Sequence, residues 1–354
     1  MAKNKFVDSQ GRTRYRFTFG PWNVHEGADP FGPPVRKSFT FDQKLGMYRE
    51  LGFEGVQFHD DDAVPDLDPK TPAQIEKIAK SVRAKLDAAG LVAEFVAPRL
   101  WETPHGIDGA YTSNSAADRR YAKERSQKAI DIARILGTPN IVLWLAREGS
   151  YVREAKNAIE AYRKQVGAIN EMLEYDPECR ILIEPKPNEP MDQAYIPTTG
   201  HALALGYLTK DPKRVGVNIE TAHVILAGLD PSDEMGFALA YDKLYTVHLN
   251  DQNGLKFDED KSFGSVNLRR AFNQVRILDK YNYGKKGEFV GLDVKAMRTQ
   301  KQDVATKHLS NSRAIFLGLV ELARSLDQGK VGQLIAERDY EELDMLIVNH
   351  LMGK

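Results

Sequence analysis

Short apolar runs alternate with longer amphipathic stretches along almost the whole chain of 354 residues. The short runs are typical of buried strands, and apolar residues at every third or fourth position in the longer stretches indicate helices with one buried face. Near-continuous apolar strands of this kind belong to parallel sheets that are covered by helices. The eight strands that the pattern predicts are Arg16–Gly20, Gly55–His59, Val92–Ala97, Asn140–Trp144, Arg180–Glu184, Val215–Glu220, Leu244–Asn250 and Glu288–Asp293.

Helix-terminating residues support the same alternation. Thr71 followed by Pro72 is typical of an N-cap with proline in the first turn, and Gly90 and Gly137 stand where two helices should end. The clearest predicted helices are Thr71–Ala89, Ala116–Leu136, Val152–Leu173 and Leu268–Tyr281.

Eight strand–helix units in succession predict an α/β fold, the (β/α)8 TIM barrel. An open doubly wound sheet is the alternative, but it usually carries a glycine-rich phosphate loop after its first strand. Here the first strand is followed by Gly20-Pro21-Trp22-Asn23-Val24-His25, which does not match such a loop. We therefore expect a catalytic barrel over residues 1–320 and a short C-terminal helical extension over residues 321–354 that makes oligomer contacts.

Acidic residues and histidines follow several of the predicted strands. In a barrel the carboxyl ends of the strands meet at one face, so these side chains should lie close together. Five carboxylates in one low-dielectric site would repel one another strongly. Two divalent cations would neutralise four of the five charges, and Lys186 can balance the last. The sequence thus predicts a two-metal enzyme whose ligands are Glu184, Glu220, His223, His248, Asp258, Asp260 and Asp293.

The overall charge excludes some classes of partner. Lys and Arg number 49 against 50 Asp and Glu, so the chain has no long-range attraction for nucleic acid or an anionic membrane. No apolar stretch approaches the roughly 20 residues that cross a bilayer, and the first residues lack the apolar core of a signal peptide. The single cysteine, Cys179, fits a reducing compartment. We expect a cytoplasmic protein.

Several motifs, in order and covering most of the chain up to about residue 320, resemble those of the D-xylose (glucose) isomerases, in the shorter class typical of actinobacteria. The resemblance implies a TIM barrel, divalent metals and aldose–ketose isomerisation of D-xylose to D-xylulose and D-glucose to D-fructose. The matching stretches are Phe17-Thr18-Phe19-Gly20, Asp29-Pro30-Phe31-Gly32, Phe58-His59-Asp60-Asp61-Asp62, Arg147-Glu148-Gly149, Glu184-Pro185-Lys186-Pro187-Asn188-Glu189-Pro190, Thr199-Gly200-His201-Ala202-Leu203-Ala204, and Gln252-Asn253-Gly254 through Asp258-Glu259-Asp260.

The resemblance also assigns the ligands to two ions, which would be Mg²⁺, Mn²⁺ or Co²⁺. Metal 1 would be held by Glu184, Glu220, Asp293 and the residue at position 248; metal 2 would share Glu220 and take His223, Asp258 and Asp260. His248 departs from the family pattern, which has aspartate there. Imidazole suits Mn²⁺ or Co²⁺ better than Mg²⁺, so we expect an altered metal preference.

The remaining site residues follow from the same resemblance. His59 with Asp62 would open the sugar ring, because an imidazole beside a carboxylate can move a proton near neutral pH. Lys186 would polarise the carbonyl at O1. Phe31 resembles a residue that reaches into a neighbouring subunit's site, which implies a homo-oligomer, a dimer or a tetramer. The residues expected to bind substrate are Trp22, Phe31, Trp101, Trp144 and Lys295.

Three other functions are compatible with parts of the pattern. His248 is similar to what L-rhamnose isomerases and ketose 3-epimerases carry on related barrels, although the epimerases look like one-metal sites. A phosphodiester-cleaving DNA-repair barrel also mixes histidines with acids, but it should be basic. A non-catalytic sugar binder would explain His248 as the mark of a lost activity, whereas the retained Lys186 and His59 favour an enzyme that transfers hydride between C1 and C2.

Overall fold

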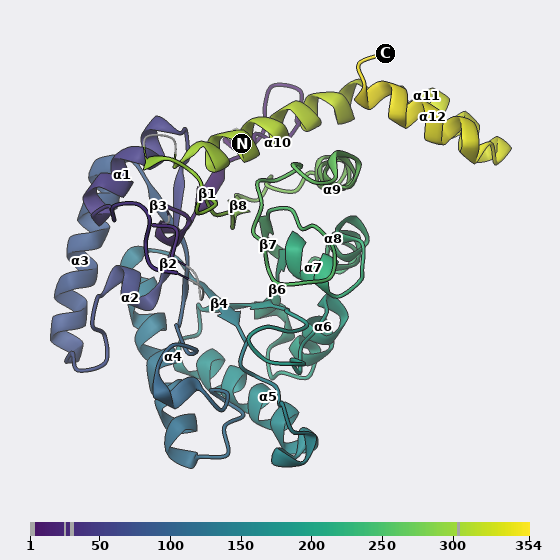
Figure 1. Ribbon diagram of the computed structural model, residues 1–354. Helices are drawn as coiled ribbons and strands as arrows, with labels where there is room; N and C mark the ends of the chain where they lie inside the picture. Colours follow the sequence, from purple (N-terminus) through teal and green to yellow (C-terminus); the bar gives the residue numbers. More distant parts are fainter. Residues whose placement is uncertain (1–3, 25, 29–31, 303–304) are drawn as a thin grey trace.

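The computed structural model describes residues 4–24, 26–28, 32–302 and 305–354, and its centre is a closed barrel of parallel strands (Figure 1). The strands follow one another in sequence order, and the last pairs with the first. This confirms the predicted (β/α)8 TIM barrel. The strands are β1 (Phe17–Phe19), β2 (Gly55–His59), β3 (Val92–Ala97), β4 (Asn140–Trp144), β5 (Arg180–Glu184), β6 (Val215–Glu220), β7 (Leu244–Leu249) and β8 (Val290–Leu292).

The helices lie outside the ring of strands (Figure 1). Helix α3 begins as its sequence predicts: the Thr71 hydroxyl accepts a hydrogen bond from the Gln74 amide, and Gly90 ends the helix at φ 68°. Up to the end of β8 the helices are α1 (Phe41–Glu50), α2 (Asp60–Ala63), α3 (Pro72–Ala89), α4 (Ala116–Leu136), α5 (Ala158–Tyr175), α6 (Thr199–Tyr207), α7 (Thr221–Leu226), α8 (Pro231–Ala240) and α9 (Leu268–Lys280).

The prediction of one helix over Val152–Leu173 was wrong at its start. A short 3₁₀ turn occupies Arg153–Ala155, and α5 begins only after Asn157. The Asn157 side chain accepts hydrogen bonds from the Ile159 and Glu160 amides, which makes it the N-cap. Val152 is 60% exposed, so its apolar side chain does not belong to the buried helix face that the pattern suggested.

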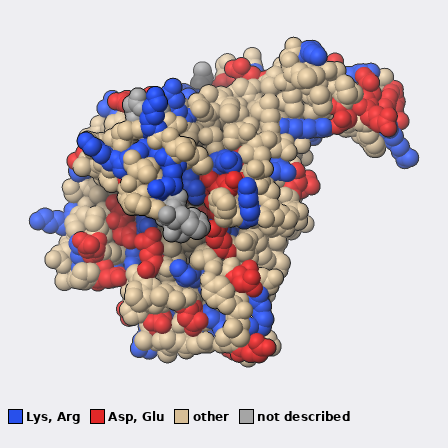
Figure 2. Space-filling model, viewed as in Figure 1, with Lys and Arg blue, Asp and Glu red and all other residues tan. Residues whose placement is uncertain are grey.

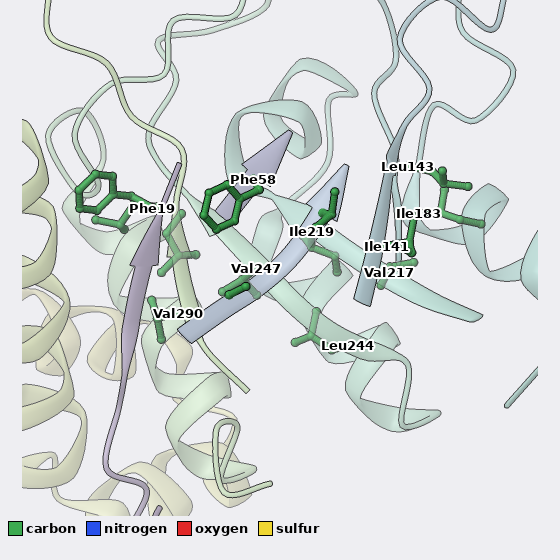
Figure 3. Close-up of a cluster of buried hydrophobic side chains, with 14 of the residues drawn as sticks. Phe19, Phe58, Ile141, Leu143, Ile183, Val217, Ile219, Leu244, Val247 and Val290 are labelled. Atoms are coloured by element: carbon green, nitrogen blue, oxygen red, sulfur yellow. The ribbon is translucent and has the colours of Figure 1, made fainter. Parts of the chain in front are cut away.

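Alternation along the strands divides the apolar residues between two packing regions. One set, including Ile141, Val217, Ile219 and Val247, belongs to the large core shared with the surrounding helices (Figure 3). A second, smaller cluster consists of Phe95, Ala97, Val142 and Leu182, with Trp22 and Tyr245 packed against it. Filled layers of side chains are what make a barrel of this size a solid core rather than a pore.

A buried carboxylate connects several strands inside the barrel. Glu94 of β3 is 3% exposed and accepts hydrogen bonds from Thr18 of β1, Gln57 of β2 and Thr246 of β7. Gly291 of β8 fits beside this group because a Cβ there would lie 2.4 Å from Gln57 Nε2 and 2.6 Å from the Val247 carbonyl oxygen. These contacts link strands that are distant in sequence and tie the barrel interior together next to His248, which pairs in register with Gly291.

Three further helices follow the barrel, as predicted: α10 (Lys307–Ser325), α11 (Gln328–Glu337) and α12 (Tyr340–Leu351). Helix α10 packs against α9, and α11 and α12 project past the edge of the barrel (Figure 1). The expected boundary at residues 320 and 321 lies within α10. None of the helices in the described part of the chain is long and apolar enough to cross a membrane.

Candidate metal centre

The barrel brings the seven predicted metal ligands to one face. Glu184 ends β5, Glu220 ends β6 and His248 lies near the end of β7, where it pairs in register with Glu220. His223 follows in the first turn of α7. Acidic side chains are visible in the middle of the face seen in Figure 2, with basic ones beside them. The seven residues all line one pocket: Glu184, Glu220, His223, His248, Asp258, Asp260 and Asp293.

Glu184, Glu220 and His248 form the first candidate ligand group. Each offers one ligand atom, and these atoms lie within 4.8 Å of one another. His248 Nδ1 is 3.5 Å from Glu184 Oε2 and 3.7 Å from Glu220 Oε2, with Asp293 Oδ2 at 3.8 Å. All three separations exceed hydrogen-bond length, and they suit atoms that converge on a common ion.

Glu220, His223 and Asp258 form the second candidate group, again with ligand atoms within 4.8 Å. His223 Nε2 lies 3.3 Å from Glu220 Oε1 and 3.1 Å from Asp258 Oδ2. Glu220 therefore presents Oε1 to this group and Oε2 to the first. One carboxylate faces both groups with different oxygens, which is the arrangement of a bridging ligand.

Unsatisfied polar atoms indicate that these groups fit cations. Within the described residues, His223 Nδ1, both ring nitrogens of His248 and Asp258 Oδ1 are buried without a hydrogen-bond partner. Buried polar groups normally have partners, so four exceptions in one cluster call for a ligand. Nitrogen and carboxylate oxygen atoms together are donors that Mn²⁺, Co²⁺ and Zn²⁺ accept readily.

The charges of the cluster perturb one another. Burial, together with the nearby carboxylates, raises the pKa of Glu220 well above its ordinary value. Burial opposes ionisation of Glu184, but the charge of His248 outweighs it and lowers the pKa of Glu184 to about 2. Burial also opposes protonation of His248, yet the Glu184 carboxylate raises its pKa well above the usual range. Protons thus hold part of the positive charge that bound cations would supply.

Asp293 and Asp260 lie at the margins of the cluster. Asp293 Oδ1 accepts hydrogen bonds from Trp22 Nε1 at 2.9 Å and Asn23 Nδ2 at 2.8 Å. Asp260 Oδ2 lies 2.9 Å from Lys295 Nζ. Lys295 is 38% exposed and pairs with this ligand, outside the residues that line the pocket.

Lys186 lies beside the second group. Its side chain is 5% exposed, and its Nζ lies 2.9 Å from Asp258 Oδ2 and 3.6 Å from Glu189 Oε2. Burial opposes its charge, but Asp258 more than compensates and raises the pKa of Lys186. The ammonium also stands 5.0 Å from the centre of the Trp144 ring. It is a fixed cation at the edge of the candidate metal centre.

Two asparagines that sequence reasoning missed orient the acids. Asn218 Nδ2 donates to Glu184 Oε2 at 2.6 Å. Asn250 Nδ2 lies 2.9 Å from Glu220 Oε1 and 3.1 Å from Asp260 Oδ1, and its side-chain oxygen accepts from the Ala222 amide. Asn218 lies in β6 and Asn250 directly follows β7, so their position at strand ends near the ligands was the available signal. Hydrogen bonds of this kind fix the orientation of ligands around an ion.

Tryptophan side chains wall the pocket, which has a volume of about 190 Å³. Trp22, Trp101 and Trp144 all line it, and Trp22 adds the hydrogen bond to Asp293 that an apolar wall alone would not provide. Three further lining residues were not foreseen: Phe95, Ala97 and Val142. Phe31, the residue expected to reach a neighbouring site, lies outside the described residues.

His59 and Asp62, which the resemblance pairs for ring opening, lie in contact, and His59 lines the pocket. His59 Nδ1 is 2.9 Å from Asp62 Oδ2, and the His59 ring lies between Trp22 and Trp101, with centroid distances of 4.2 and 5.3 Å. A second partner was not foreseen: Arg99 Nη2 is 2.7 Å from the same His59 nitrogen. Arg99 stands two residues after the end of β3, so it too belongs to the carboxyl face.

Comparison with known proteins gives a consistent result. A profile described as the xylose isomerase-like TIM barrel matches residues 46–285. The xylose isomerase of Thermus thermophilus is 34% identical over 331 residues, covering 92% of this chain and 84% of the relative. The chain also resembles the 3-keto-D-glucoside 4-epimerase of E. coli, with a TM-score of 0.62 and 14% identity over 86% of this chain and all of that one. The D-psicose 3-epimerase of Clostridium cellulolyticum H10 has a TM-score of 0.58 and 12% identity, over 87% of this chain and 99% of that one. At these identities the two structures show the fold alone.

Proposed function

Because the chain belongs to the xylose isomerase-like TIM barrel family, we propose that it interconverts D-xylose and D-xylulose, and D-glucose and D-fructose at the same site. One observation carries the proposal: Glu220 is shared by two ligand groups that line the same pocket as His59. A sugar seated there can meet a proton-transfer group and two cations at once.

The seven ligands would hold two divalent ions. Glu184, Glu220, His248 and Asp293 would hold one, and Glu220, His223, Asp258 and Asp260 the other. When bound, the ions supply Lewis acidity that stabilises negative charge on the sugar oxygens. With two lysines, five carboxylates and two neutral histidines, four added charges give the site a net charge of +1, which an anionic sugar oxygen would neutralise.

The protein's own side chains would move and orient the atoms. His59 would take the proton from the anomeric hydroxyl and return one to the ring oxygen, with Asp62 orienting the imidazole. Lys186, fixed by Asp258, would donate a hydrogen bond to O1 and stabilise the charge that develops there. A hydride shift from C2 to C1 would follow in the opened sugar.

The pocket walls suit a hydride shift because several of their side chains are aromatic or apolar. The Trp22, Trp101 and Trp144 rings exclude water from the sugar carbons, and Phe95 and Val142 extend the apolar surface. An enediol route needs a base that exchanges its proton with water, whereas a hydride shift does not. The walls therefore protect the migrating hydrogen from solvent.

A ketose 3-epimerase is the second candidate, because His248 replaces the aspartate of the isomerases. The second ligand group of Glu220, His223 and Asp258 opposes it, since one-metal epimerases do not need these residues. A non-catalytic sugar binder would not need Lys186 held beside Asp258.

We further propose a cytoplasmic homo-oligomer, a dimer or a tetramer. The single cysteine, Cys179, is buried, which agrees with a reducing compartment. Helices α11 and α12 project from the barrel and carry exposed apolar residues such as Ile335 and Met345, a surface that a neighbouring subunit could cover. Light scattering of the active protein tests the assembly, and a monomer with full activity would contradict it.

The proposed activity is tested by incubating the protein with D-xylose, D-glucose, L-rhamnose or D-fructose and Mn²⁺, Co²⁺ or Mg²⁺. We expect xylulose and fructose as products of the first two aldoses, with activity lost in EDTA and restored by metal. Epimerisation of fructose at C3, or turnover of none of the sugars, would refute it. Run in D₂O, the reaction should leave the migrating position almost free of deuterium.

A further inference from the structure

His59 Nδ1 contacts two groups that need opposite forms of the imidazole. Asp62 Oδ2 lies 2.9 Å from it and, as a carboxylate, can only accept a hydrogen bond. Arg99 Nη2 lies 2.7 Å from it and can only donate. A neutral histidine carries one ring proton, so Nδ1 can serve Asp62 or Arg99 but not both. The nitrogen left over, Nε2, is the one that remains for a sugar in the pocket.

Arg99 is held in place by its other nitrogens. Its Nε lies 2.8 Å from Asp61 Oδ1, its Nη1 lies 2.9 Å from Glu102 Oε1, and its side chain is 17% exposed. Nη2 is the remaining arm, and it lies between His59 Nδ1 at 2.7 Å and Asp62 Oδ1 at 3.5 Å. Nη2 carries two N–H bonds, which can be directed to these two atoms.

The support continues into a buried ion pair. The Arg99 amide donates to Asp60 Oδ1 at 3.2 Å, and Asp60, which is fully buried, is bound through both oxygens by Arg125 at 2.8 and 2.9 Å. Bidentate pairs of this kind are geometrically specific. The position of Arg99 is therefore fixed from its backbone as well as from its guanidinium.

We propose that Arg99 is a positioning residue for ring opening, and that its competition with Asp62 for His59 Nδ1 sets which tautomer of His59 faces the sugar pocket. The inference rests on the proposed function. With Nδ1–H directed to Asp62, Nε2 presents a lone pair and can accept a proton. With Nδ1 accepting from Arg99, Nε2 carries the proton and can donate to the ring oxygen.

Ring opening is a proton relay in which Nε2 first accepts a proton and then donates it. The O1–H bond breaks and its proton passes to Nε2, while a C1–O1 double bond forms. The C1–O5 bond breaks, its electron pair moves to the ring oxygen, and that oxygen takes the proton from Nε2. No proton is gained or lost overall. The Arg99 guanidinium, whose Nη2 lies 2.7 Å from Nδ1, repels the positive charge that the ring gains when Nε2 takes the proton, which favours the return of that proton to the sugar.

The tautomer is measured by ¹⁵N NMR of histidine-labelled protein with diamagnetic Mg²⁺, and His59→Gln assigns the signal. We expect Arg99→Met to shift His59 toward Nδ1–H and Asp62→Asn to shift it toward Nε2–H. Arg119→Met, which removes a guanidinium that caps carbonyls of Ser113 and Asn114, is the matched control and should change nothing. Arg99→Gln replaces Arg99→Met if the latter does not fold.

Kinetics separate positioning from a structural role. Arg99→Met should lower kcat/KM for D-xylose about 10–100-fold, a part of what general acid–base catalysis contributes. The inhibition constant of xylitol, an open-chain polyol, should stay within about twofold of wild type, because xylitol needs no ring opening. Arg99→Lys should restore part of the rate.

Unchanged tautomer populations in Arg99→Met would overturn the inference, and so would an equal loss of xylose turnover and xylitol binding. If the wild-type protein turns over no sugar, the proposed function fails, and the tautomer measurement alone decides whether Arg99 controls His59.

Discussion

Replacing Glu220 by glutamine removes a carboxylate that belongs to both ligand groups while keeping the size of the side chain. If Glu220 bridges two ions, both should be lost together. His223→Ala and His248→Ala are the matched controls, because each histidine belongs to one group only. Each control should therefore keep one ion. The number of bound Mn²⁺ ions is measured by isothermal titration calorimetry and by elemental analysis after gel filtration. It should be two in the wild type, one in each histidine variant and none in Glu220→Gln.

Thermal unfolding gives the expected size of the effect. An ion present at about 100 times its Kd stabilises the folded state by about 2.7 kcal/mol. The unfolding entropy of about 2.1 cal/mol/K per residue amounts to about 0.74 kcal/mol/K for 354 residues. Each ion should then raise the Tm by about 4 °C, and the pair by about 7 °C. Mn²⁺ should give the full rise in the wild type, half of it in the histidine variants and almost none in Glu220→Gln.

Without metal, Glu220→Gln should be at least as stable as the wild type. Burial and nearby carboxylates raise the pKa of Glu220, so above the ordinary carboxyl pKa its ionisation costs folding free energy. Glutamine carries no such cost, and metal-free Glu220→Gln should unfold at the same temperature as the wild type or higher. A Glu220→Gln variant that keeps one ion with wild-type affinity would refute the bridge. A variant already destabilised without metal would contradict the cost assigned to the Glu220 charge.

Three further predictions concern the same centre. Asn250→Ala should weaken Mn²⁺ binding about 10–100-fold in calorimetry, because Asn250 orients Glu220. The control Asn253→Ala, at an exposed position, should bind Mn²⁺ normally. Equal affinities of the two variants would count against this role of Asn250. Mn²⁺ affinity should fall as pH falls, because raised pKa values keep His223 and His248 protonated and each must release its proton to bind; calorimetry in two buffers that reports no proton release would contradict this. His248→Asp should move the Mg²⁺ to Mn²⁺ affinity ratio toward Mg²⁺ by about tenfold, and an unchanged ratio would show that His248 is not a ligand.

Much of the fold could be predicted because the strands of a parallel barrel have a characteristic apolar sequence pattern. Strands buried on both sides appear as apolar runs, so β4, β5 and β6 begin and end where the sequence pattern placed them. The start of α5 could not be placed from apolar spacing alone. Val152 is exposed, and the cap at Asn157 decides where the helix begins, a local polar signal that the spacing does not contain.

In the candidate site, too, some residues could be predicted from the sequence and others could not. Residues at strand ends must converge in a barrel, so Glu184, Glu220 and His248 could be grouped from the sequence. Which polar neighbour orients each ligand depends on side-chain directions between strands, and Asn250 was missed for that reason. Arg99 was missed because its contact with His59 joins residues 40 positions apart through the end of an arginine side chain.

Anomalous diffraction at the manganese edge, from crystals grown with Mn²⁺, tests the central claim most directly. The shared position of Glu220 predicts two peaks in the pocket, one contacting Glu220 Oε2 and His248 and the other contacting Glu220 Oε1 and His223. A single peak, or a second ion that does not contact Glu220, would contradict it.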